Sequence, residues 1–364
     1  MNLRIPGPTP CAQEALAAMS RQMINHRGPE FGDIMTRVTS RVKEVFETRN
    51  DLLILTTSGT GGMEAAVVNF LSPGDEVLCV SIGAFGDRFS QIAKAYGARA
   101  TVLSFEWGKA ADPDEVDKAL AAGPGYKALL VTHNETSTGV TNPLEALARV
   151  ARKHGVLTMV DAVSSLSAIP CPVDKWGLDV VVTGSQKGWM VPPGLAMMSV
   201  GERGWKANSE AKMPRYYFDV GKAKKSLESG QTPWTPAVSV FFALDVALDM
   251  MLKEGLEGIF ARHARIGAFT RQQVRALGLE IFADERFASN TVTAVRVPEG
   301  VDGKALNKIM REDYDTVLAG GQAALTGKIF RIGHLGLVSE ADIQSCVDAL
   351  RQALPRVGFT PAKA

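Results

Sequence analysis

Lys187 stands shortly after an apolar, β-branched run and is surrounded by residues that form turns. The run is Val180–Thr183, and the turn-forming segment closes at Pro192–Gly194. A lysine held in a pocket at the end of a strand can lose its charge through desolvation, or it can form a Schiff base with a carbonyl compound. Considered alone, Lys187 is more simply a solvated surface lysine, so its meaning depends on its companions.

Asp161 ends a second apolar run, which begins at Val156. A carboxylate in such a place must find a partner or shift its pKa. It can cap a helix that follows, or it can face the cationic ring nitrogen of a cofactor and tune the electronics of an electron sink. Both interpretations stay open for this residue alone.

The stretch "SGTGG", residues 58–62, follows another apolar run and leads into a helix pattern. Glycines allow close backbone approach, and a helix beginning at about Gly62 offers free N–H groups and a positive dipole end, which suit a phosphate. The stretch matches neither a Walker loop nor G-x-G-x-x-G, which disfavours nucleoside triphosphates and dinucleotides. A plain turn between strand and helix is the alternative.

These three features together match the needs of pyridoxal phosphate. Lys187 offers an amine for the aldehyde, Asp161 a carboxylate for the ring nitrogen, and the 58–62 loop a site for the phosphate. Phe85 follows a predicted strand and could lie flat on the ring, which adds about 0.5–1.5 kcal/mol, or it could belong to the core. Thr136 could reach the phenolic oxygen of the cofactor, or it could bond within its own turn.

Alternating strands and helices must position these groups. The pattern predicts strands at 51–59, 75–83, 126–133, 156–162 and 178–184, and helices at 62–71, 88–97 and 143–155. Nearly continuous apolar strands between helices indicate an α/β fold with a parallel sheet covered on both faces. Ligands of such sheets bind outside the carboxyl ends of the strands, where the polar residues above collect.

The pattern changes near residue 250. Helices are predicted at 237–255, 257–278, 302–313 and 339–354, and strands at 290–298 and 328–334. Ser339 is the expected N-cap of the last helix. We therefore predict a large cofactor-binding domain over residues 16–250 and a smaller α+β domain over residues 251–364.

Composition sets limits on the function. The chain has 364 residues, 46% of them hydrophobic and 22% charged, with a net charge of +1. Without a basic excess, nucleic acid is not an expected partner. The start lacks an apolar run, which predicts neither a signal peptide nor a membrane span. The four scattered cysteines predict neither a metal site nor a disulfide framework, so we expect a cytoplasmic protein.

Eight stretches of the chain resemble the class V aminotransferases of fold type I, in particular the alanine–glyoxylate and serine–glyoxylate aminotransferase group. They are "PGPTP" (6–10), "SGTGGMEAA" (58–66), "THNETSTGV" (132–140), "VDAVSSL" (160–166), "TGSQKG" (183–188), "PPG" (192–194), "TPWTPAV" (232–238) and "GKIFRIGHLG" (327–336). They keep the order of the family along almost the whole chain. The resemblance implies a large domain whose mostly parallel sheet is flanked by helices, a smaller α+β domain, and an N-terminal arm, residues 1–15, that reaches the active site.

The resemblance also implies roles for individual residues. Lys187 would bind the aldehyde of the cofactor, and Asp161 would pair with the ring nitrogen of the cofactor. The remaining cofactor contacts would come from Thr60, Gly61 and Gly62 at the phosphate, from Gln186 and Thr136 on the ring oxygen side, and from Phe85 by stacking. Arg331 would bind the substrate carboxylate as a bidentate pair. His334 could line the pocket, although a structural histidine is the simpler interpretation.

Two residues would act across a subunit boundary. Thr232 and Thr235 would complete the phosphate site of a neighbouring subunit, which implies a homodimer. The chain differs from some relatives in having Phe85 where they have tryptophan, and Thr232 where they have tyrosine. These differences bear on substrate detail and cofactor affinity rather than on the class of reaction.

The implied reaction moves the amino group of a small amino acid, alanine or serine, to glyoxylate in two stages with ping-pong kinetics. One alternative is another chemistry of the same fold, such as cysteine desulfuration, which needs a cysteine near Arg331. No cysteine lies between Thr291 and Arg331. A second alternative is a non-catalytic subunit of a larger complex, although such subunits usually lose the lysine or the arginine that this chain keeps.

Overall fold

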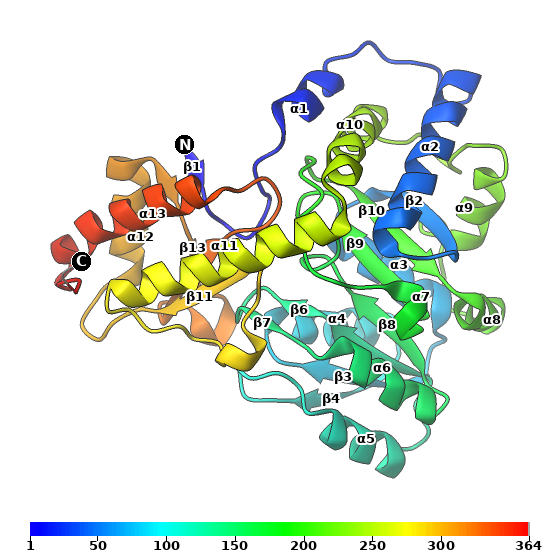
Figure 1. The fold of residues 1–364 in the computed structure, drawn as a ribbon. Helices are drawn as coiled ribbons and strands as arrows, with labels where there is room; N and C mark the ends of the chain where they lie inside the picture. The colour runs from blue at the N-terminus through cyan, green and yellow to red at the C-terminus, as the bar shows by residue number, and fades with distance from the viewer. Residues whose placement is uncertain (363–364) are drawn as a thin grey trace.

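A central sheet of seven strands organises the protein in this computed structural model, which describes residues 1–362 (Figure 1). Across the sheet the strands are β2 (Asp51–Thr57), β10 (Gly194–Val200), β9 (Val180–Gly184), β8 (Leu157–Asp161), β5 (Ala128–Thr132), β3 (Glu76–Ser81) and β4 (Arg99–Ser104). Only β10 runs antiparallel to its neighbours, while β9, β8, β5, β3 and β4 pair in parallel. The mostly parallel sheet is therefore present as predicted.

Two strands of this sheet were not predicted, and each has a physical reason. The strand β4 forms an edge of the sheet, and its residues alternate between exposed and half-buried, so it lacks the apolar run of a central strand. The strand β10 follows the lysine segment without an intervening helix, and it turns back between β2 and β9. An antiparallel return of this kind breaks the strand–helix alternation on which the prediction depended.

Both faces of the sheet are buried. Successive strand residues point to opposite faces, so in β2 Leu52 and Ile54 join one apolar cluster whereas Leu53 and Leu55 join another. The first cluster includes residues of α1 (Gln13–Met19), α2 (Pro29–Phe46), α5 (Pro113–Ala122), α6 (Leu144–Lys153), α7 (Val173–Trp176) and α10 (Val238–Glu254). The second includes residues of α3 (Gly59–Phe70), α4 (Ala84–Ala95), α8 (Glu202–Glu210) and α9 (Val220–Leu227).

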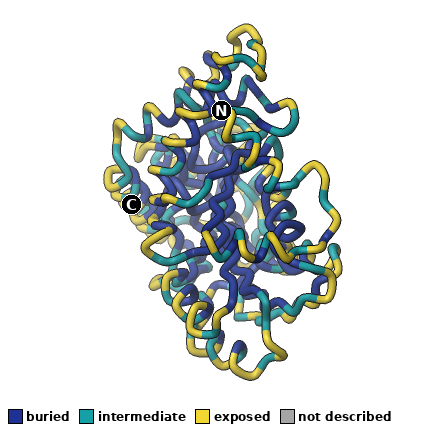
Figure 2. The backbone as a smooth tube through the Cα atoms, turned by 90° about the vertical axis from the view of Figure 1, so that its right-hand side faces the viewer, coloured by how far each residue is buried: buried dark blue, intermediate teal, exposed yellow. Residues whose placement is uncertain are grey.

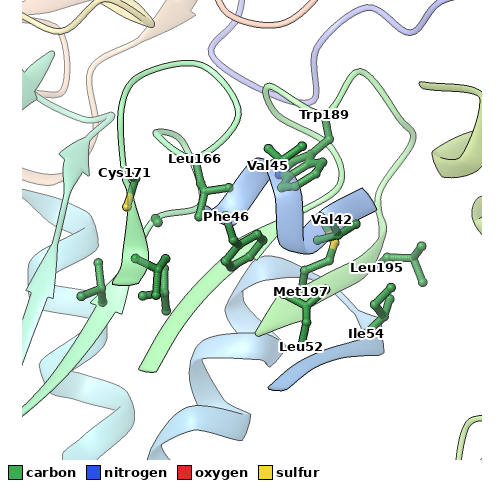
Figure 3. Close-up of a cluster of buried hydrophobic side chains, with 14 of the residues drawn as sticks. Val42, Val45, Phe46, Leu52, Ile54, Leu166, Cys171, Trp189, Leu195 and Met197 are labelled. Carbon is green, nitrogen blue, oxygen red and sulfur yellow. The ribbon is translucent and has the colours of Figure 1, made fainter. Parts of the chain in front are cut away.

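The first cluster also holds the segment that follows Lys187. Trp189 is fully buried there, and its ring centroid lies 6.0 Å from that of Phe46 on α2 (Figure 3). The indole N–H of Trp189 donates a hydrogen bond to the hydroxyl of Thr183 at 3.1 Å. This large side chain therefore fixes the segment between β9 and β10 to the core.

The chain beyond α10 builds a second, smaller sheet. It consists of the antiparallel strands β11 (Val292–Arg296), β14 (Ile329–Gly333) and β13 (Ala319–Gly320). The helices here are α11 (Leu256–Ala276), α12 (Gly303–Tyr314) and α13 (Glu340–Ala353). Ser339 caps α13, as predicted, in a capping box with Asp342.

The first residues of the chain lie against this C-terminal part (Figure 1). The short strand β1 (Asn2–Leu3) pairs in parallel with β12 (Thr316–Val317). The segment after β1 then runs toward the carboxyl edge of the large sheet, where Thr9 donates from its backbone to the carbonyl of Gln186 at 3.1 Å. The domain limits at residues 15 and 250 stay a prediction, because the N-terminal segment contacts both parts.

Burial follows the layers of the fold. Figure 2 shows the buried backbone in the interior, with the exposed positions gathered on surface loops and outer helices. Within residues 1–362, the structure contains no helix that is both long enough and apolar enough to cross a membrane.

A substitution at Gly62 would test how α3 packs on the sheet. A Cβ atom at Gly62 would lie 2.8 Å from Val182 Cγ1 and 2.9 Å from the Cβ of Ala196, both in the sheet. We expect Gly62→Ala to push α3 away from the sheet and to lower the free energy of unfolding by about 1–3 kcal/mol, the usual cost of overpacking. Thermal unfolding of the purified protein measures this as a lower Tm.

Gly258→Ala is the matched control, because Gly258 is an exposed glycine within helix α11. Alanine is the better helix former by about 1 kcal/mol, so this variant should keep or raise the Tm. Equal changes in Tm for the two variants would contradict the packing role of Gly62.

Candidate active site

A cavity of about 300 Å³ lies at the carboxyl edge of the large sheet. Its walls are formed by Gly7, Pro8, Ser58, Gly59, Thr60, Met63, Phe85, Arg88, Phe89, Ile92, Asn134, Thr136, Asp161, Val163, Ser164, Gln186, Lys187 and Pro193. The strands β9, β8, β5 and β3 are consecutive neighbours in the sheet, and each leads into the wall from its carboxyl end. Six of the predicted site residues line this cavity: Thr60, Phe85, Thr136, Asp161, Gln186 and Lys187.

Lys187 projects from a tightly bonded segment after β9. The Ser185 hydroxyl donates to the carbonyl of Pro192 at 2.7 Å and accepts from the N–H of Leu195 at 3.2 Å. The Lys187 carbonyl accepts from the Thr9 hydroxyl at 2.8 Å. The backbone of the lysine is thus fixed, while its long side chain extends into the cavity.

The amine of Lys187 lies in a buried and partly cationic place. Its Nζ donates to the carbonyl of Pro6 at 2.8 Å, and the side chain is buried. Burial, with a smaller contribution from the positive charge of Arg331, lowers the pKa of Lys187 to about 8, against the opposing charge of Asp161. A substantial fraction of this amine is therefore neutral near pH 8, and only a neutral amine is a nucleophile or a base.

Asp161 ends β8 and is buried beside the lysine. Its Oδ1 accepts from the N–H of Val163 at 2.9 Å, within a turn. Burial raises the pKa of Asp161 to about 6, while the N–H of Val163 and the charge of Lys187 act in the opposite direction. The turn that follows is not a helix, so Asp161 is not a helix N-cap, and a cationic group in the cavity would stabilise its charged form.

The N-terminus of α3 forms another part of the wall. The helix begins at Gly59 rather than near Gly62, because Ser58 is its N-cap and accepts from the N–H of Gly61 at 3.3 Å. By helix geometry the N–H groups of Gly59 and Thr60 have no partner within the helix, and both residues line the cavity. Gly61 and Gly62 are not among the lining residues.

A polar network joins the segments that follow strands β5 and β8. The Thr136 hydroxyl donates to Ser164 Oγ at 2.7 Å, and the side-chain amide of Asn134 donates to the same oxygen at 2.9 Å. The Oε1 atom of Gln186 is buried and has no hydrogen-bond partner among the described residues. Sequence reasoning missed Asn134 and Ser164, although both stand within the motifs "NETSTG" and "VDAVSSL" and directly follow predicted strands.

Phe85 and Arg88 enter the cavity from the first turns of α4. The guanidinium carbon of Arg88 lies 4.8 Å from the centre of the Phe85 ring. Arg88 is exposed, yet it lines the cavity, and its positive charge lowers the pKa of both Lys187 and Asp161. Sequence reasoning missed Arg88. The one sequence feature that could have identified it as a cavity residue is its position three residues after Phe85, on the same face of the helix.

Arg331 lies beside the cavity but is not one of the residues that line it. On β14 it is buried, with Nε and Nη2 donating to the carbonyl of Gly320 at 3.0 and 2.8 Å, and Nη1 donating to the carbonyl of Thr136 at 3.1 Å. These contacts use three of the five N–H groups of a guanidinium, which leaves one on each terminal nitrogen. Burial lowers the pKa of Arg331 to about 10, and the negative charge of Glu135 opposes this shift.

Thr232 and Thr235 lie at a separate, shallow cleft. Together with Pro233 and Trp234 they line it opposite strand β2 and the aromatic pair Tyr217 and Phe218. The Thr232 hydroxyl donates to the carbonyl of Trp234 at 2.6 Å. Within one chain, these two threonines do not join the cavity that holds Lys187.

Comparison with known proteins identifies the family. The sequence pattern of the family described as "Aminotransferase class-V" matches residues 11–348. The chain belongs to the class V aminotransferases. Their cofactor is pyridoxal phosphate, and the fold is that of the fold type I enzymes, as the resemblance implied.

The relatives of this class V aminotransferase carry different names. The L-aspartate–glyoxylate aminotransferase of Paracoccus denitrificans is 37% identical, over 98% of this chain and 91% of that protein. The small subunit of a soluble hydrogenase of Synechococcus sp. is 47% identical, over 98% of this chain and 94% of that protein. Among solved structures, the alanine–glyoxylate aminotransferase of Nostoc sp. has a TM-score of 0.94 and 30% identity, over 97% of this chain and 94% of that one.

The groups around the cavity of this aminotransferase suit pyridoxal phosphate. A buried amine, a buried carboxylate and a helix N-terminus line one space, and they match an aldehyde, a ring nitrogen and a phosphate. The unpartnered Oε1 of Gln186 offers a further polar contact there. These observations concern the side chains themselves, so they support the cofactor independently of the family resemblance.

The pKa of Lys187 gives a pH dependence that can be measured without turnover. Covalent attachment of pyridoxal phosphate to the cofactor-free protein needs the neutral amine, so its rate should rise with pH and level off above about pH 8. An exposed lysine, with a pKa of about 10.4, would keep the rate rising for roughly two further pH units. Visible absorbance after rapid mixing measures this rate.

Lys187→Ala is the control for this experiment, because it should remove the absorbance change at every pH. A rate that still rises steeply at about pH 10 would contradict the lowered pKa of Lys187.

Proposed function

We propose that the enzyme transfers the amino group of a small amino acid, alanine or serine, to glyoxylate by a ping-pong mechanism. The observation that carries the proposal is the shared cavity of Lys187 and Asp161, in which burial brings their pKa values to about 8 and about 6. Glyoxylate as the acceptor is supported by the names of the Paracoccus and Nostoc relatives. Because the Paracoccus name specifies L-aspartate, the donor is the part of this proposal that most needs an experiment.

In this proposal the chain would hold the cofactor at five places. Lys187 would bind the aldehyde carbon, and Asp161 would pair with the ring nitrogen. Thr60, with Gly61 and Gly62 behind it in α3, would bind the phosphate through the helix N-terminus. Thr136 and Gln186 would contact the ring oxygen side, and Phe85 would lie against the ring face.

Lys187 is the residue that moves protons. Bound pyridoxal phosphate supplies an aldehyde that takes up the amino group and a ring that stabilises negative charge on the α-carbon of the substrate. The amine of Lys187, once free, removes the α-proton as a general base and returns a proton as a general acid, which its lowered pKa favours near neutral pH. Asp161 would stay charged beside a cationic ring nitrogen and would so keep a proton on that nitrogen.

Arg331 orients the substrate. Its two remaining N–H groups stand one on each terminal nitrogen of the guanidinium, whose planar fork suits a carboxylate. Three hydrogen bonds to the carbonyls of Gly320 and Thr136 fix the plane of that fork. The same arginine therefore serves both the amino acid and the keto acid, since each carries an α-carboxylate.

A homodimer belongs to the same proposal. Thr232 and Thr235 lie away from the cavity of their own chain, as expected if they complete the phosphate site of a second copy. Exposed aromatic side chains lie next to them, with Tyr216 stacked on Trp234 at 4.9 Å between ring centroids. Such a surface suits burial against a partner.

A cytoplasmic location is also part of the proposal. All four cysteines carry free thiols, which suits a reducing compartment.

The properties of the four cysteine side chains support cysteine desulfuration less well than transamination. Cys79, Cys171 and Cys346 are buried, and burial raises the pKa of each thiol to about 12. Cys11 is half-buried, and burial raises its pKa as well. A thiol with a raised pKa is a poor nucleophile, and none of the four lines the cavity.

A non-catalytic subunit of a larger complex is the second candidate, and the name of the Synechococcus relative, a hydrogenase subunit, favours it. A chain with only that role has no physical need for a lysine of lowered pKa beside a buried aspartate. Transfer of an amino group by the purified protein alone separates the two candidates.

The direct test of the proposed reaction is a panel of amino donors with glyoxylate as the acceptor. Alanine or serine should give glycine with parallel double-reciprocal plots, the mark of ping-pong kinetics. Lys187→Ala should lower kcat at least about 10³-fold, because it removes the general base as well as the covalent attachment. Aspartate as the best donor would overturn the donor assignment, and full turnover by Lys187→Ala would overturn the mechanism.

Arg331 gives a separate prediction about binding. Arg331→Ala should raise the KM for amino acid and keto acid about 10- to 100-fold, as loss of hydrogen bonds to a charged group costs about 1.5–3 kcal/mol. Arg331→Lys keeps the charge but loses the fork, so its KM should lie between those of the wild type and the alanine variant. Visible absorbance should show the cofactor still bound, and unchanged KM values would remove Arg331 from this role.

A further inference from the structure

Helix α4 carries one wall of the cavity but lacks a cap of its own. Phe85, Arg88, Phe89 and Ile92 of this helix all line the cavity. The residue before the helix is Gly83, which has no side chain with which to accept a hydrogen bond. The first N–H groups of a helix have no partner within it, so acceptors must come from elsewhere.

These acceptors come from a segment about fifty residues further along the chain. The N–H of Ala84 donates to the hydroxyl of Ser137 at 2.9 Å. The N–H of Phe85 donates to Glu135 Oε2 at 3.1 Å and the N–H of Gly86 to the same oxygen at 3.0 Å. The first three N–H groups of α4 are therefore all satisfied by two side chains from the segment after β5.

The charged form of Glu135 fits this place although the residue is fully buried. Its carboxylate also accepts from the N–H of Ser137 at 3.1 Å and from the Ser137 hydroxyl at 2.5 Å. The carboxylate therefore acts as the acceptor in each of these hydrogen bonds, which is the role of its charged form. Burial raises the pKa of Glu135, whereas these donors lower it. The positive end of the helix dipole and the nearby charge of Arg331 favour the carboxylate as well.

The contact leaves no spare room. A Cβ atom at Gly83 would lie 2.5 Å from Glu135 Cγ and 2.5 Å from Ser137 Oγ. The glycine is thus required by the approach of the two side chains, and the distance between α4 and the Glu135 segment is closely set. A shift of one would move the other.

The neighbours of Glu135 form a different wall of the same cavity. Asn134 and Thr136 line it and bond to Ser164 in the turn after Asp161. The carbonyl of Thr136 also accepts from Arg331. A single segment, residues 134–137, therefore joins the phenylalanine wall, the aspartate wall and the arginine.

We propose that Glu135 is a positioning residue, which caps α4 from the segment after the neighbouring strand β5 and sets Phe85 at the correct distance from the Asn134–Thr136 wall. The inference rests on the proposed function in that pyridoxal phosphate occupies this space. Glu135 touches neither cofactor nor substrate in this assignment. It acts through the backbone of Phe85, which would lie against the cofactor ring.

Glu135→Gln tests the assignment, because the amide has the same size but turns one acceptor oxygen into a donor NH₂ group. That group would face N–H donors and could not bond to them. When pyridoxal phosphate is added back to the cofactor-free variant, we expect its dissociation constant to be about tenfold higher than for the wild type. The circular dichroism of the bound cofactor should also change, because it reports the asymmetric contacts of the ring.

Asp179→Asn is the matched control. Asp179 is also a buried carboxylate that accepts from a backbone N–H, that of Thr158 at 2.8 Å, but it does not line the cavity. This variant should lower the Tm and leave the cofactor dissociation constant and the dichroism unchanged. If the two variants weaken cofactor binding equally, or if Glu135→Gln changes neither readout, the assignment is wrong.

Ser137→Ala gives a second route if the glutamine variant does not fold. It removes the acceptor of the Ala84 N–H and one donor to Glu135, so both readouts should change in the same direction by a smaller amount. An unchanged dissociation constant and dichroism in a folded Ser137→Ala protein would also count against the assignment. Cofactor binding is measured without any amino acid, so a failure here is separate from a failure of the proposed transamination.

Discussion

Burial of two opposite charges at one edge of the sheet is the constraint on which the rest of the site depends. An exposed lysine would be fully protonated near neutral pH and could not act as a base there. Desolvation brings the pKa of Lys187 down to about 8 and that of Asp161 up to about 6, while each charge partly stabilises the other. Asp161 ends β8 and pairs with Val182 of the neighbouring parallel strand β9, and Lys187 stands three residues after the end of β9, so the sheet brings the two residues to the same edge.

Distant parts of the chain close this site. The carbonyl of Pro6 accepts from the Lys187 amine, and Gly333 on β14 donates from its backbone to the carbonyl of Arg4 at 2.6 Å. Gly336 packs so closely on the lysine segment that a Cβ atom there would lie 3.2 Å from the carbonyl oxygen of Lys187. The N-terminal segment is therefore held between the C-terminal part and the lysine, which explains why motifs at both ends of the chain accompany those of the sheet.

The sequence predicted the central elements well, because apolar runs and helix periodicity follow from burial alone. The residues at the ends of β9, β8, β5 and β3 could be found because parallel strands bring their carboxyl ends to one edge. The strands β4 and β10 were missed, the first because an edge strand buries little and the second because it reverses direction. Contacts such as that of Glu135 with α4 could not be predicted, because they join residues about fifty positions apart through geometry that leaves no pattern in the sequence.

The glycines of "SGTGG" show why packing and function are not competing interpretations of one motif. A Cβ atom at Gly59 would lie 2.9 Å from Val163 on the cavity wall, and one at Gly62 would lie 2.8 Å from Val182 in the sheet. Gly62 therefore lets α3 lie directly on the strands, and Gly59 lets its first turn approach the turn after Asp161. These close contacts accompany the position of the α3 N-terminus, which lines the cavity together with Asp161. The helix dipole can act on a phosphate there because the two glycines allow α3 to pack closely against the sheet and against the turn after Asp161.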